Sequence, residues 1–385
     1  MKPNIIKPIY TLGVLVLVLC FLVGCTGDFR STSGWSGALL DDDKVYIGTK
    51  EANLTVLDKD TGRYLWSFPR DGDDLKIEGI YGTPIVAEDS IFFGSYSGEL
   101  FALDPNSERV IWKFPTDGHI VGSPLHHNSS NGHKIIVGST DKHLYSIDMK
   151  SGRLDWSFEA DGEIWSSPVE KDGIIYFGSL DGKLYAVHGE TVDTNQPGDL
   201  KWAYETSGAI ASSAVITSVD NEDVILIGSF DRMLYALDLN GQLTWNTPFE
   251  ATNWFWATPV VVEDTIYAPS TDGGLYAINL FDGNKVWQSP FMTEGPIVSS
   301  PAIVGKNRDI VIGSDDGSVY LVDRQNGREI RSFNTDDHVR ANITSEVNKV
   351  IISGNDHQIR LADLEDGFWI ETWCYNTKDK SNNCK

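Results

Sequence analysis

The sequence has little positive charge. It contains 31 Lys and Arg residues against 55 Asp and Glu, which gives a formal net charge of -24, and no stretch gathers basic residues. Because binding to nucleic acid phosphates requires clustered positive charge, this composition argues against a DNA- or RNA-binding protein. Charged residues make up only 22% of the chain and aromatic residues 11%, which argues against disorder and predicts a large buried core.

Cysteine is also scarce, with four residues in the chain. Cys20 lies in an apolar N-terminal segment and Cys25 directly after it, so Cys374 and Cys384 remain as a pair near the C-terminus. Two spaced cysteines without companion histidines do not make a zinc site. We therefore expect a disulfide between Cys374 and Cys384, which would contribute about 2 to 3 kcal/mol.

The first 24 residues predict a lipoprotein signal peptide. Lys2 and Lys7 precede an apolar stretch from Ile9 to Val23, and residues 22–25, Leu-Val-Gly-Cys, resemble a bacterial lipobox. Lipid would then be attached to Cys25, and residues 25–33 would form a lipidated linker. The alternative is an uncleaved membrane anchor. Both interpretations place the remaining chain outside the cytoplasm, at the periplasmic side of a bacterial membrane or at the cell surface.

Helical periodicity is weak after residue 45, which disfavours α/β folds and helical bundles. Instead one pattern recurs: an apolar strand ending in Gly-Ser, a short turn, a segment similar to Leu-Tyr-Ala-Leu-Asp, a second turn and a strand with Trp. The copies are spaced by about 40 to 50 residues, which indicates a repeat protein. The eight anchor positions are Gly48, Gly94, Gly138, Gly178, Gly228, Pro269, Gly313 and Gly354.

Each copy predicts four short strands. In the copy around Gly178 we expect strands at residues 164–169, 174–178, 183–187 and 200–204, with Asp181 and Gly182 in a type I′ hairpin turn. Four strands in a repeat of about 40 to 45 residues are typical of a β-propeller blade. The sequence therefore predicts an all-β, eight-bladed β-propeller of four-stranded antiparallel blades over residues 34–373, monomeric, with a C-terminal tail at 374–385.

A tryptophan follows the anchor by 17 or 18 residues in five copies and by 24 residues at Trp202, where residues 191–198 lengthen the turn. In the last two copies the same spacing selects Arg331 and Glu371 instead, so the repeat degrades at its end. A tryptophan buries on the order of 200 Å² and its ring N–H requires an acceptor, so one per blade can both pack and align the ring. The six residues are Trp66, Trp112, Trp156, Trp202, Trp245 and Trp287.

Residues 57–66, Leu-Asp-Lys-Asp-Thr-Gly-Arg-Tyr-Leu-Trp, resemble the tryptophan-docking motif of pyrroloquinoline-quinone (PQQ) repeats. Ile147-Asp148, with Ser151-Gly152 and Trp156, repeats the motif, and the similarity extends over nearly the whole chain after the signal segment. In that family the tryptophan is wedged between adjacent blades. The resemblance therefore implies a blade-docking role for the six tryptophans.

The resemblance covers two functional classes. Quinoprotein dehydrogenases of this fold bind PQQ with Ca²⁺ over the central channel and oxidise alcohols or sugars. Other members, such as the lipoprotein subunit of the outer-membrane protein assembly machine, serve as scaffolds without cofactor. This chain has no vicinal Cys-Cys pair and few insertions from which a cofactor lid could be built. We expect a scaffold with no catalytic, cofactor-binding or metal-binding residues; the alternatives are a PQQ- and Ca²⁺-dependent dehydrogenase and a sensor of small solutes.

One position suggests where such a scaffold binds. The residue that enters each inner strand should lie at one mouth of the central channel, and it is Trp35, Tyr81, Val121, Trp165, Ala211, Trp256, Val298 and Arg340 in the successive copies. Tryptophan, tyrosine and arginine are enriched at binding hot spots, so we expect envelope proteins or extended peptides to bind here. The loop Asn253, Trp254, Phe255 and Trp256 is the best single candidate. The alternative is that these rings only fill the channel or pack on neighbouring blades.

Overall fold

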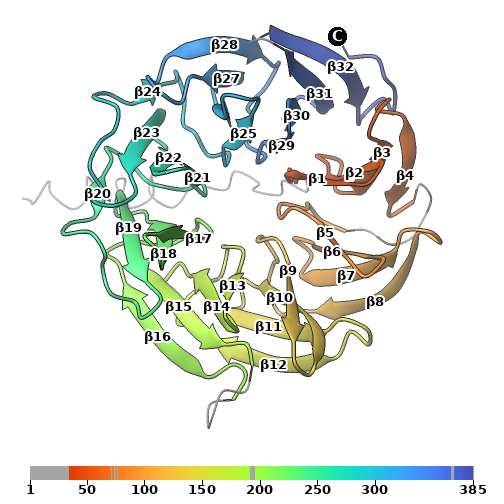
Figure 1. The fold of residues 1–385 in the computed structure, drawn as a ribbon. Helices are drawn as coiled ribbons and strands as arrows, with labels where there is room; N and C mark the ends of the chain where they lie inside the picture. The colour runs from red at the N-terminus through yellow and green to blue at the C-terminus, as the bar shows by residue number, and fades with distance from the viewer. Residues whose placement is uncertain are drawn as a thin grey trace, which may run out of the picture. The chain divides into compact units, whose positions relative to one another are not determined.

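The computed structural model describes residues 34–70, 72, 75, 77–190, 196–365 and 368–384. Within these ranges the regular elements are β-strands, and they form eight four-stranded antiparallel sheets that surround a central axis as blades (Figure 1). The predicted eight-bladed β-propeller is confirmed. The predicted signal peptide and linker, including Cys25, lie outside the described residues. Among the residues described, no helix is long and apolar enough to cross a membrane.

The strands follow one another regularly along the chain. Blades 1 to 4 contain β1 (Ala38–Asp41), β2 (Lys44–Gly48), β3 (Leu54–Asp58), β4 (Tyr64–Phe68), β5 (Ile85–Ala87), β6 (Ser90–Gly94), β7 (Glu99–Asp104), β8 (Arg109–Pro115), β9 (Leu125–Ser129), β10 (Gly132–Gly138), β11 (His143–Asp148), β12 (Leu154–Glu159), β13 (Val169–Lys171), β14 (Ile174–Gly178), β15 (Lys183–His188) and β16 (Leu200–Glu205). Blades 5 to 8 contain β17 (Val215–Val219), β18 (Glu222–Gly228), β19 (Met233–Asp238), β20 (Phe249–Glu250), β21 (Val260–Val262), β22 (Thr265–Pro269), β23 (Gly274–Asn279), β24 (Phe291–Met292), β25 (Ala302–Val304), β26 (Asp309–Gly313), β27 (Ser318–Val322), β28 (Glu329–Asn334), β29 (Thr344–Glu346), β30 (Lys349–Ser353), β31 (Gln358–Glu365) and β32 (Phe368–Asn376).

The four strands of every blade are consecutive in sequence, and the first of them lies nearest the axis (Figure 1). Because consecutive strands run antiparallel, the loop that enters each blade and the hairpin between its second and third strands lie at the same end of the propeller. That end is called the mouth face below. Blade 1 contains only strands from the N-terminal side and blade 8 only strands from the C-terminal side, so no strand is exchanged where the ring closes.

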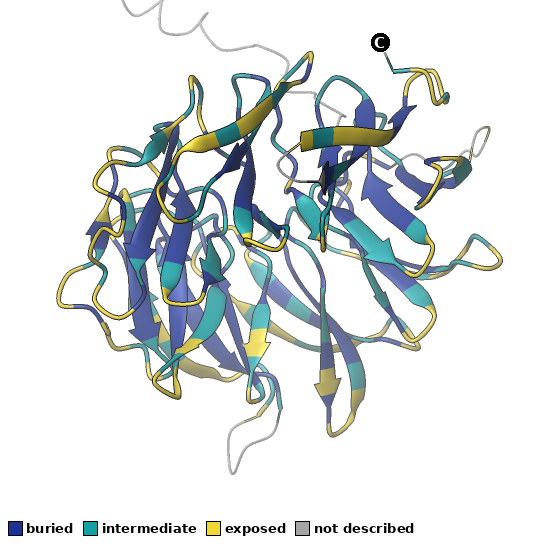
Figure 2. Ribbon diagram, turned by 45° about the horizontal axis from the view of Figure 1, so that its top comes forward, coloured by how far each residue is buried: buried dark blue, intermediate teal, exposed yellow. Residues whose placement is uncertain are grey.

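The core lies between the blades. Each hydrophobic cluster joins residues of two neighbouring blades; one of them packs Phe92 of blade 2 against Ile135 and Val137 of blade 3. Figure 2 shows the resulting pattern, with buried middle strands and outer strands that are largely exposed. The continuous apolar runs of the middle strands therefore fit blades that bury both faces of these strands.

The first strand of a blade is shorter than the sequence predicts. Residues 164–169 were expected as a strand in blade 4, but β13 starts at Val169. Ile164 is fully buried, and its N–H donates to the carbonyl of Ser139 in the preceding blade instead of to its own sheet. Its hydrophobicity thus reflects packing between blades and not strand pairing.

The predicted type I′ turn at Asp181 and Gly182 is wrong. Gly182 has a φ of 87°, whereas Asp181 is absent from the residues with positive φ. The N–H of Gly182 donates to the carbonyl of Ser179, which corresponds to a type I turn followed by one left-handed residue. This three-residue loop requires a positive φ at a single position, which is why Lys142 and Arg232 can replace the glycine in blades 3 and 5.

The outer strands of blades 5 and 6 contain two residues each, Phe249–Glu250 and Phe291–Met292. In both blades a proline, Pro248 or Pro290, stands before the phenylalanine. Proline cannot donate a ladder hydrogen bond, so pairing is interrupted after the tryptophan. Phe249 nevertheless pairs with Leu234, as Phe158 pairs with Leu144 in blade 3, so the core position is still filled.

Candidate functional site

The docking tryptophans connect each blade to the next. In four of the six, the ring N–H donates to a backbone carbonyl of the following blade: Trp112 to Met149 (2.9 Å), Trp202 to Leu239 (3.0 Å), Trp245 to Leu280 (3.0 Å) and Trp287 to Arg324 (3.2 Å). Trp66 is buried and Trp156 half-buried at the corresponding places. A Cβ at Gly152, which has a φ of 68°, would lie 2.6 Å from the Trp112 ring, so the docking turn requires glycine.

The eighth docking position holds a tryptophan that the spacing rule missed. Trp373, and not Glu371, pairs with Leu361 where Trp66 pairs with Val56 in blade 1. Its ring N–H donates to the carbonyl of Lys59 in blade 1 at 2.8 Å. Blade 8 therefore docks on blade 1 in the same way as blades 2, 4, 5 and 6 dock on their neighbours.

The C-terminal tail adds to this closure. Cys374 and Cys384 form a disulfide with Cα atoms 5.9 Å apart. Asn382, inside the closed loop, donates to the carbonyl of Gly62 in blade 1 at 3.1 Å. Polar contacts hold the rest of the boundary, including an ion pair between Lys59 and Glu346 at 2.5 Å.

At the mouth face, all eight predicted residues lie in the loops that lead into the innermost strands, and all eight are half-buried. A repeated hydrogen bond fixes these loops. In blades 2 to 8 the residue after the Gly-Ser anchor donates its N–H to the carbonyl two residues before the mouth residue; Tyr96 bonds Gly79 and Phe230 bonds Ala209 in this way, both at 2.8 Å. In these seven blades the bond therefore places the mouth residue at the same height along the propeller axis.

A second belt of hydrogen bonds surrounds the channel. In blades 3 to 8, the residue two positions after the mouth residue has a hydroxyl or amide oxygen that accepts the backbone N–H of the equivalent residue in the preceding blade. The bonds run from Thr83 to Ser123 (2.8 Å), Ser123 to Ser167 (2.8 Å), Ser167 to Ser213 (2.9 Å), Ser213 to Thr258 (3.3 Å), Thr258 to Ser300 (3.2 Å) and Ser300 to Asn342 (3.0 Å). Blade 1 has Gly37 at this position, so the belt has its seam where the ring closes.

The mouth aromatics form two arcs. The first arc runs over blades 8, 1, 2 and 3. Trp35 meets Tyr81 edge to face at 4.9 Å between ring centroids, and Tyr81 meets Tyr96 at 5.4 Å. Tyr96 stacks on His119. At the other end, the Arg340 guanidinium lies 5.7 Å from the Trp35 ring centroid.

The second arc runs over blades 4, 5 and 6. Trp165 and Trp256 come from blades 4 and 6, and their ring centroids are 5.9 Å apart. They can meet because the intervening mouth residue, Ala211, has only a methyl group. Phe230 stacks on Trp256 at 5.2 Å and on Trp254 at 4.8 Å. Trp254 is the most exposed member, with 45% of its surface accessible.

Phe255 was expected among the partner-binding residues, and this is wrong. It is 1% exposed and packs with Phe249 and Tyr276 in the core between blades 5 and 6. Alternation along the loop turns Trp254 and Trp256 away from the core and Phe255 into it. Asn253 is half-buried, and its backbone carbonyl accepts a hydrogen bond from the Ser270 hydroxyl at 3.2 Å.

Sequence reasoning missed Phe230 and Tyr96 as members of the arcs. Both directly follow the Gly-Ser anchor of their copies, at Gly228-Ser229 and Gly94-Ser95. The other six copies have no aromatic residue and no consensus at this position, so the repeat pattern does not indicate a role for it. The residues are Lys50, Thr140, Leu180, Thr271, Asp315 and Asn355. Aligning this column separately from the anchor would have shown two further aromatic residues at the mouth face.

Aspartate carboxylates stabilise the hairpins that lie at the mouth face, between the second and third strands of the blades. In five blades an aspartate of the hairpin accepts the hydroxyl hydrogen of the tyrosine four residues later, as in Asp181 with Tyr185 (2.7 Å) and Asp272 with Tyr276 (2.7 Å). Burial and then the bond to the carboxylate raise the pKa of Tyr185 and of Tyr276 to about 12. These aspartates therefore hold the hairpins in place. Within the described part of the chain, no group of three or more His, Cys, Asp or Glu side chains could hold a metal ion.

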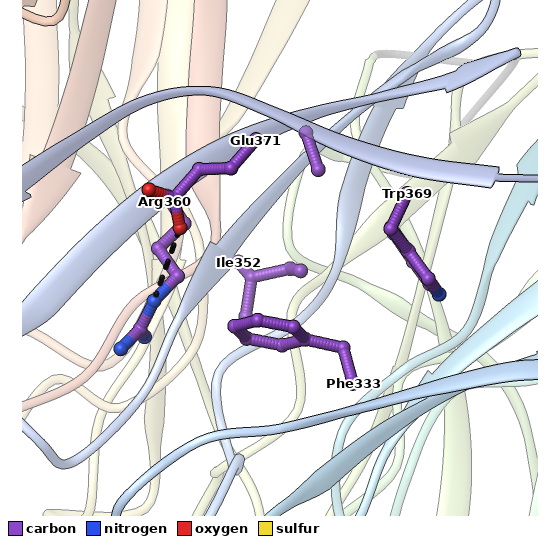
Figure 3. Close-up of a pocket in the computed structure, with 6 residues that line it drawn as sticks. Phe333, Ile352, Arg360, Trp369 and Glu371 are labelled. Carbon is purple, nitrogen blue, oxygen red and sulfur yellow. Dashed lines mark ion pairs between the residues drawn. The ribbon is translucent and has the colours of Figure 1, made fainter.

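A small cavity lies between blades 7 and 8 (Figure 3). Its volume is about 80 Å³, far below the several hundred Å³ that cofactor sites occupy. Arg360 lines it and is 5% exposed, and its charge is matched by Asp356 at 2.8 Å. Nearby, Arg331 occupies the docking position of blade 7, with its guanidinium 4.8 Å from the Phe368 ring centroid. The cavity therefore adjoins the one boundary at which the docking residue is not tryptophan.

Comparison with known families agrees with this architecture. Residues 29–115 and 100–333 match a PQQ-repeat family profile described as outer membrane protein assembly factor BamB. The chain belongs to this PQQ-like propeller family. Two curated members are outer membrane protein assembly factors BamB, from Moranella endobia (26% identical over 213 residues) and Yersinia pestis (27% over 173 residues). These matches cover 52% and 42% of this chain, and they span only 51% and 38% of the relatives' own lengths.

The PQQ-like fold is also found among solved structures. The crystal structure of BamB from Moraxella catarrhalis matches with a TM-score of 0.66 and 18% identity, over 86% of this chain and 96% of that one. At such identity the likeness shows the fold alone.

Proposed function

We propose that this protein is a non-catalytic, lipid-anchored scaffold that binds partner proteins or extended peptides at the bacterial envelope through its mouth face, in the assembly of outer-membrane proteins. The observation that carries the proposal is the pair of aromatic arcs, held at one height by a repeated backbone bond and left half-buried. Half-exposed tryptophan, tyrosine and arginine are the side chains that dominate binding energy at protein interfaces.

Membership of the PQQ-like family supports the assembly role, because the curated relatives bear the name of an outer membrane assembly factor. The lipobox at Cys25 supports attachment to a membrane, and the acidic composition supports it further, since a body of net charge -24 is not held to anionic lipid by its surface. The proposal includes no cofactor and no enzymatic reaction. The outer strand edges, such as β12 and β16, offer a second route by which extended peptides could add a strand.

The proposal is tested with the double variant Trp254→Ala/Trp256→Ala. We expect it to lose proteins that co-purify with the wild-type chain from its native membranes, while its melting temperature changes by less than about 3 °C, because Trp254 is exposed and Trp256 half-buried. A large fall in melting temperature would instead assign both rings to the core. In parallel, PQQ and Ca²⁺ are added to the purified protein; stoichiometric uptake with dye-linked oxidation of alcohols or sugars would refute the scaffold in favour of the dehydrogenase.

A further inference from the structure

The two arcs of the mouth differ in their charge balance. In the first arc, Arg340 lies over the Trp35 ring and forms two hydrogen bonds of 2.8 Å with the Asp315 carboxylate of the neighbouring blade. That arc therefore contains a complete set of an aromatic ring, a guanidinium and a carboxylate. The pKa of Arg340 is raised by its bonds to Asp315, as expected for a satisfied ion pair.

The second arc contains the ring and the carboxylate but no cation. The Glu163 carboxylate accepts the ring N–H of Trp165 at 2.9 Å, and Trp256 lies beside that ring. Among the described residues, no lysine, arginine or histidine pairs with Glu163, and no arginine or lysine lies over Trp165 or Trp256. Glu163 is exposed, and both tryptophans keep part of their surface at the mouth.

We propose that the cradle formed by Glu163, Trp165 and Trp256 binds an arginine side chain that a partner protein supplies in an extended segment. This rests on the proposed scaffold function and specifies the chemistry of its partner. The Trp165 N–H bonds one oxygen of the Glu163 carboxylate, which holds the group in place and leaves the other oxygen to accept a guanidinium N–H. The guanidinium can also lie against a tryptophan ring, as Arg340 does against Trp35 within the same face.

The charge around the cradle favours the same partner. The hairpins of blades 4, 5 and 6 place Asp181, Asp231 and Asp272 at this face, where each accepts hydrogen bonds as a carboxylate. A whole-chain charge of -24 adds a long-range attraction for basic segments and repels acidic ones. An arginine is preferred to a lysine because its planar group can pair with the carboxylate and stack on the ring at once.

The test uses the full-length protein in mild detergent and a fluorescein-labelled nonapeptide with one central arginine among valine and threonine residues. Binding is measured by fluorescence anisotropy, and two companion peptides carry lysine or uncharged citrulline at the centre. The variants are Glu163→Gln and Glu294→Gln. Glu294 is the matched control, because it is an exposed glutamate of the same face, in blade 7, with no ion pair among the described residues.

We expect the wild type to bind the arginine peptide about tenfold more tightly than the citrulline peptide, with lysine between them. Glu163→Gln removes this preference, and Glu294→Gln changes it by less than about twofold, as a distant charge should. Equal binding of the arginine and citrulline peptides, or equal effects of the two glutamine variants, would overturn the proposal. If native partners still depend on Trp254 and Trp256 in that case, the scaffold function stands without the arginine cradle. If the wild type retains no partner from its membranes, the scaffold function itself fails.

Discussion

At the residue scale, position in the repeat decides what an aromatic side chain does. Trp245 and Trp254 are nine residues apart, yet the first is 3% exposed and bonded to the next blade, while the second is 45% exposed at the mouth. The docking role could be predicted from sequence because the motif around it recurs. The burial of Phe255 is visible only when the copies are compared, because the residue before the mouth residue is also apolar and buried in other copies, as at Ile164 and Ile210.

Trp373 is the docking tryptophan of blade 8, the least regular copy, so substituting it tests the docking arrangement there. Trp373→Phe keeps most of the buried ring but removes the donor to Lys59, so we expect a loss of about 0.5 to 1.5 kcal/mol in the free energy of unfolding. Urea denaturation followed by circular dichroism measures it. Trp254→Phe is the control and should change stability by less than about 0.5 kcal/mol. Equal effects of the two substitutions would mean that the ring bond at the closure contributes nothing.

The hairpin tyrosines make stability sensitive to alkali. Tyr185 and Tyr276 have pKa values of about 12 in the folded chain, above the ordinary value of 10.0. The folded state therefore keeps protons that the unfolded chain releases, and this contribution is complete below pH 10 and lost as pH rises through 12. A titration of absorbance at 295 nm should show tyrosines that ionise well after the exposed ones. In Tyr185→Phe the late fraction should shrink by one residue; an unchanged late fraction would contradict the assignment.

At the element scale, the blades differ mainly in their first and last strands. The middle strands could be predicted because two-sided burial gives continuous apolar runs such as Ile174–Gly178. The inner strands could not be placed, since Ile164 is apolar because it packs against the preceding blade and not because it pairs in its own sheet. The eighth docking residue was missed because a spacing of 17 residues from Gly354 selects Glu371, whereas Trp373 lies 19 residues after that anchor.

Blade 7 gives an element-scale prediction. Arg331→Trp would place a docking ring at the boundary that now contains a cavity of about 80 Å³, and we expect a gain of about 0.5 to 2 kcal/mol in the free energy of unfolding. Thermal and urea denaturation measure the gain. Arg331→Ala serves for comparison and should destabilise the chain by losing the contact with Phe368. If the tryptophan variant is no more stable than the alanine variant, the position is not equivalent to the other docking slots.

At the scale of the whole molecule, closure depends on side chains and the tail and not on a shared strand. Trp373, Asn382 and the Lys59–Glu346 ion pair connect the last blade to the first, and the disulfide fixes the tail that carries Asn382. The eight-blade count could be predicted from the repeat. The manner of closure could be predicted only in part: the docking turn at Gly62 accepts Trp373 as the repeat implies, but the contacts of Asn382 and Glu346 with blade 1 follow no repeat.

The disulfide gives the corresponding prediction. Cys374→Ser/Cys384→Ser should lower the free energy of unfolding by about 2 to 3 kcal/mol. In hydrogen exchange, amides of blades 1 and 8 should lose more protection than those of blades 4 and 5, because only the former contact the tail. Uniform loss of protection around the ring would show that the bond stabilises the chain without acting at the closure.

The absence of strand exchange also affects the order in which the protein can be completed. A chain synthesised from its amino end can complete seven blades in turn, but the first blade keeps an uncovered apolar side until the last blade forms. A product truncated before residue 344 would form an incomplete ring with two uncovered apolar blade faces, which would make it prone to aggregate.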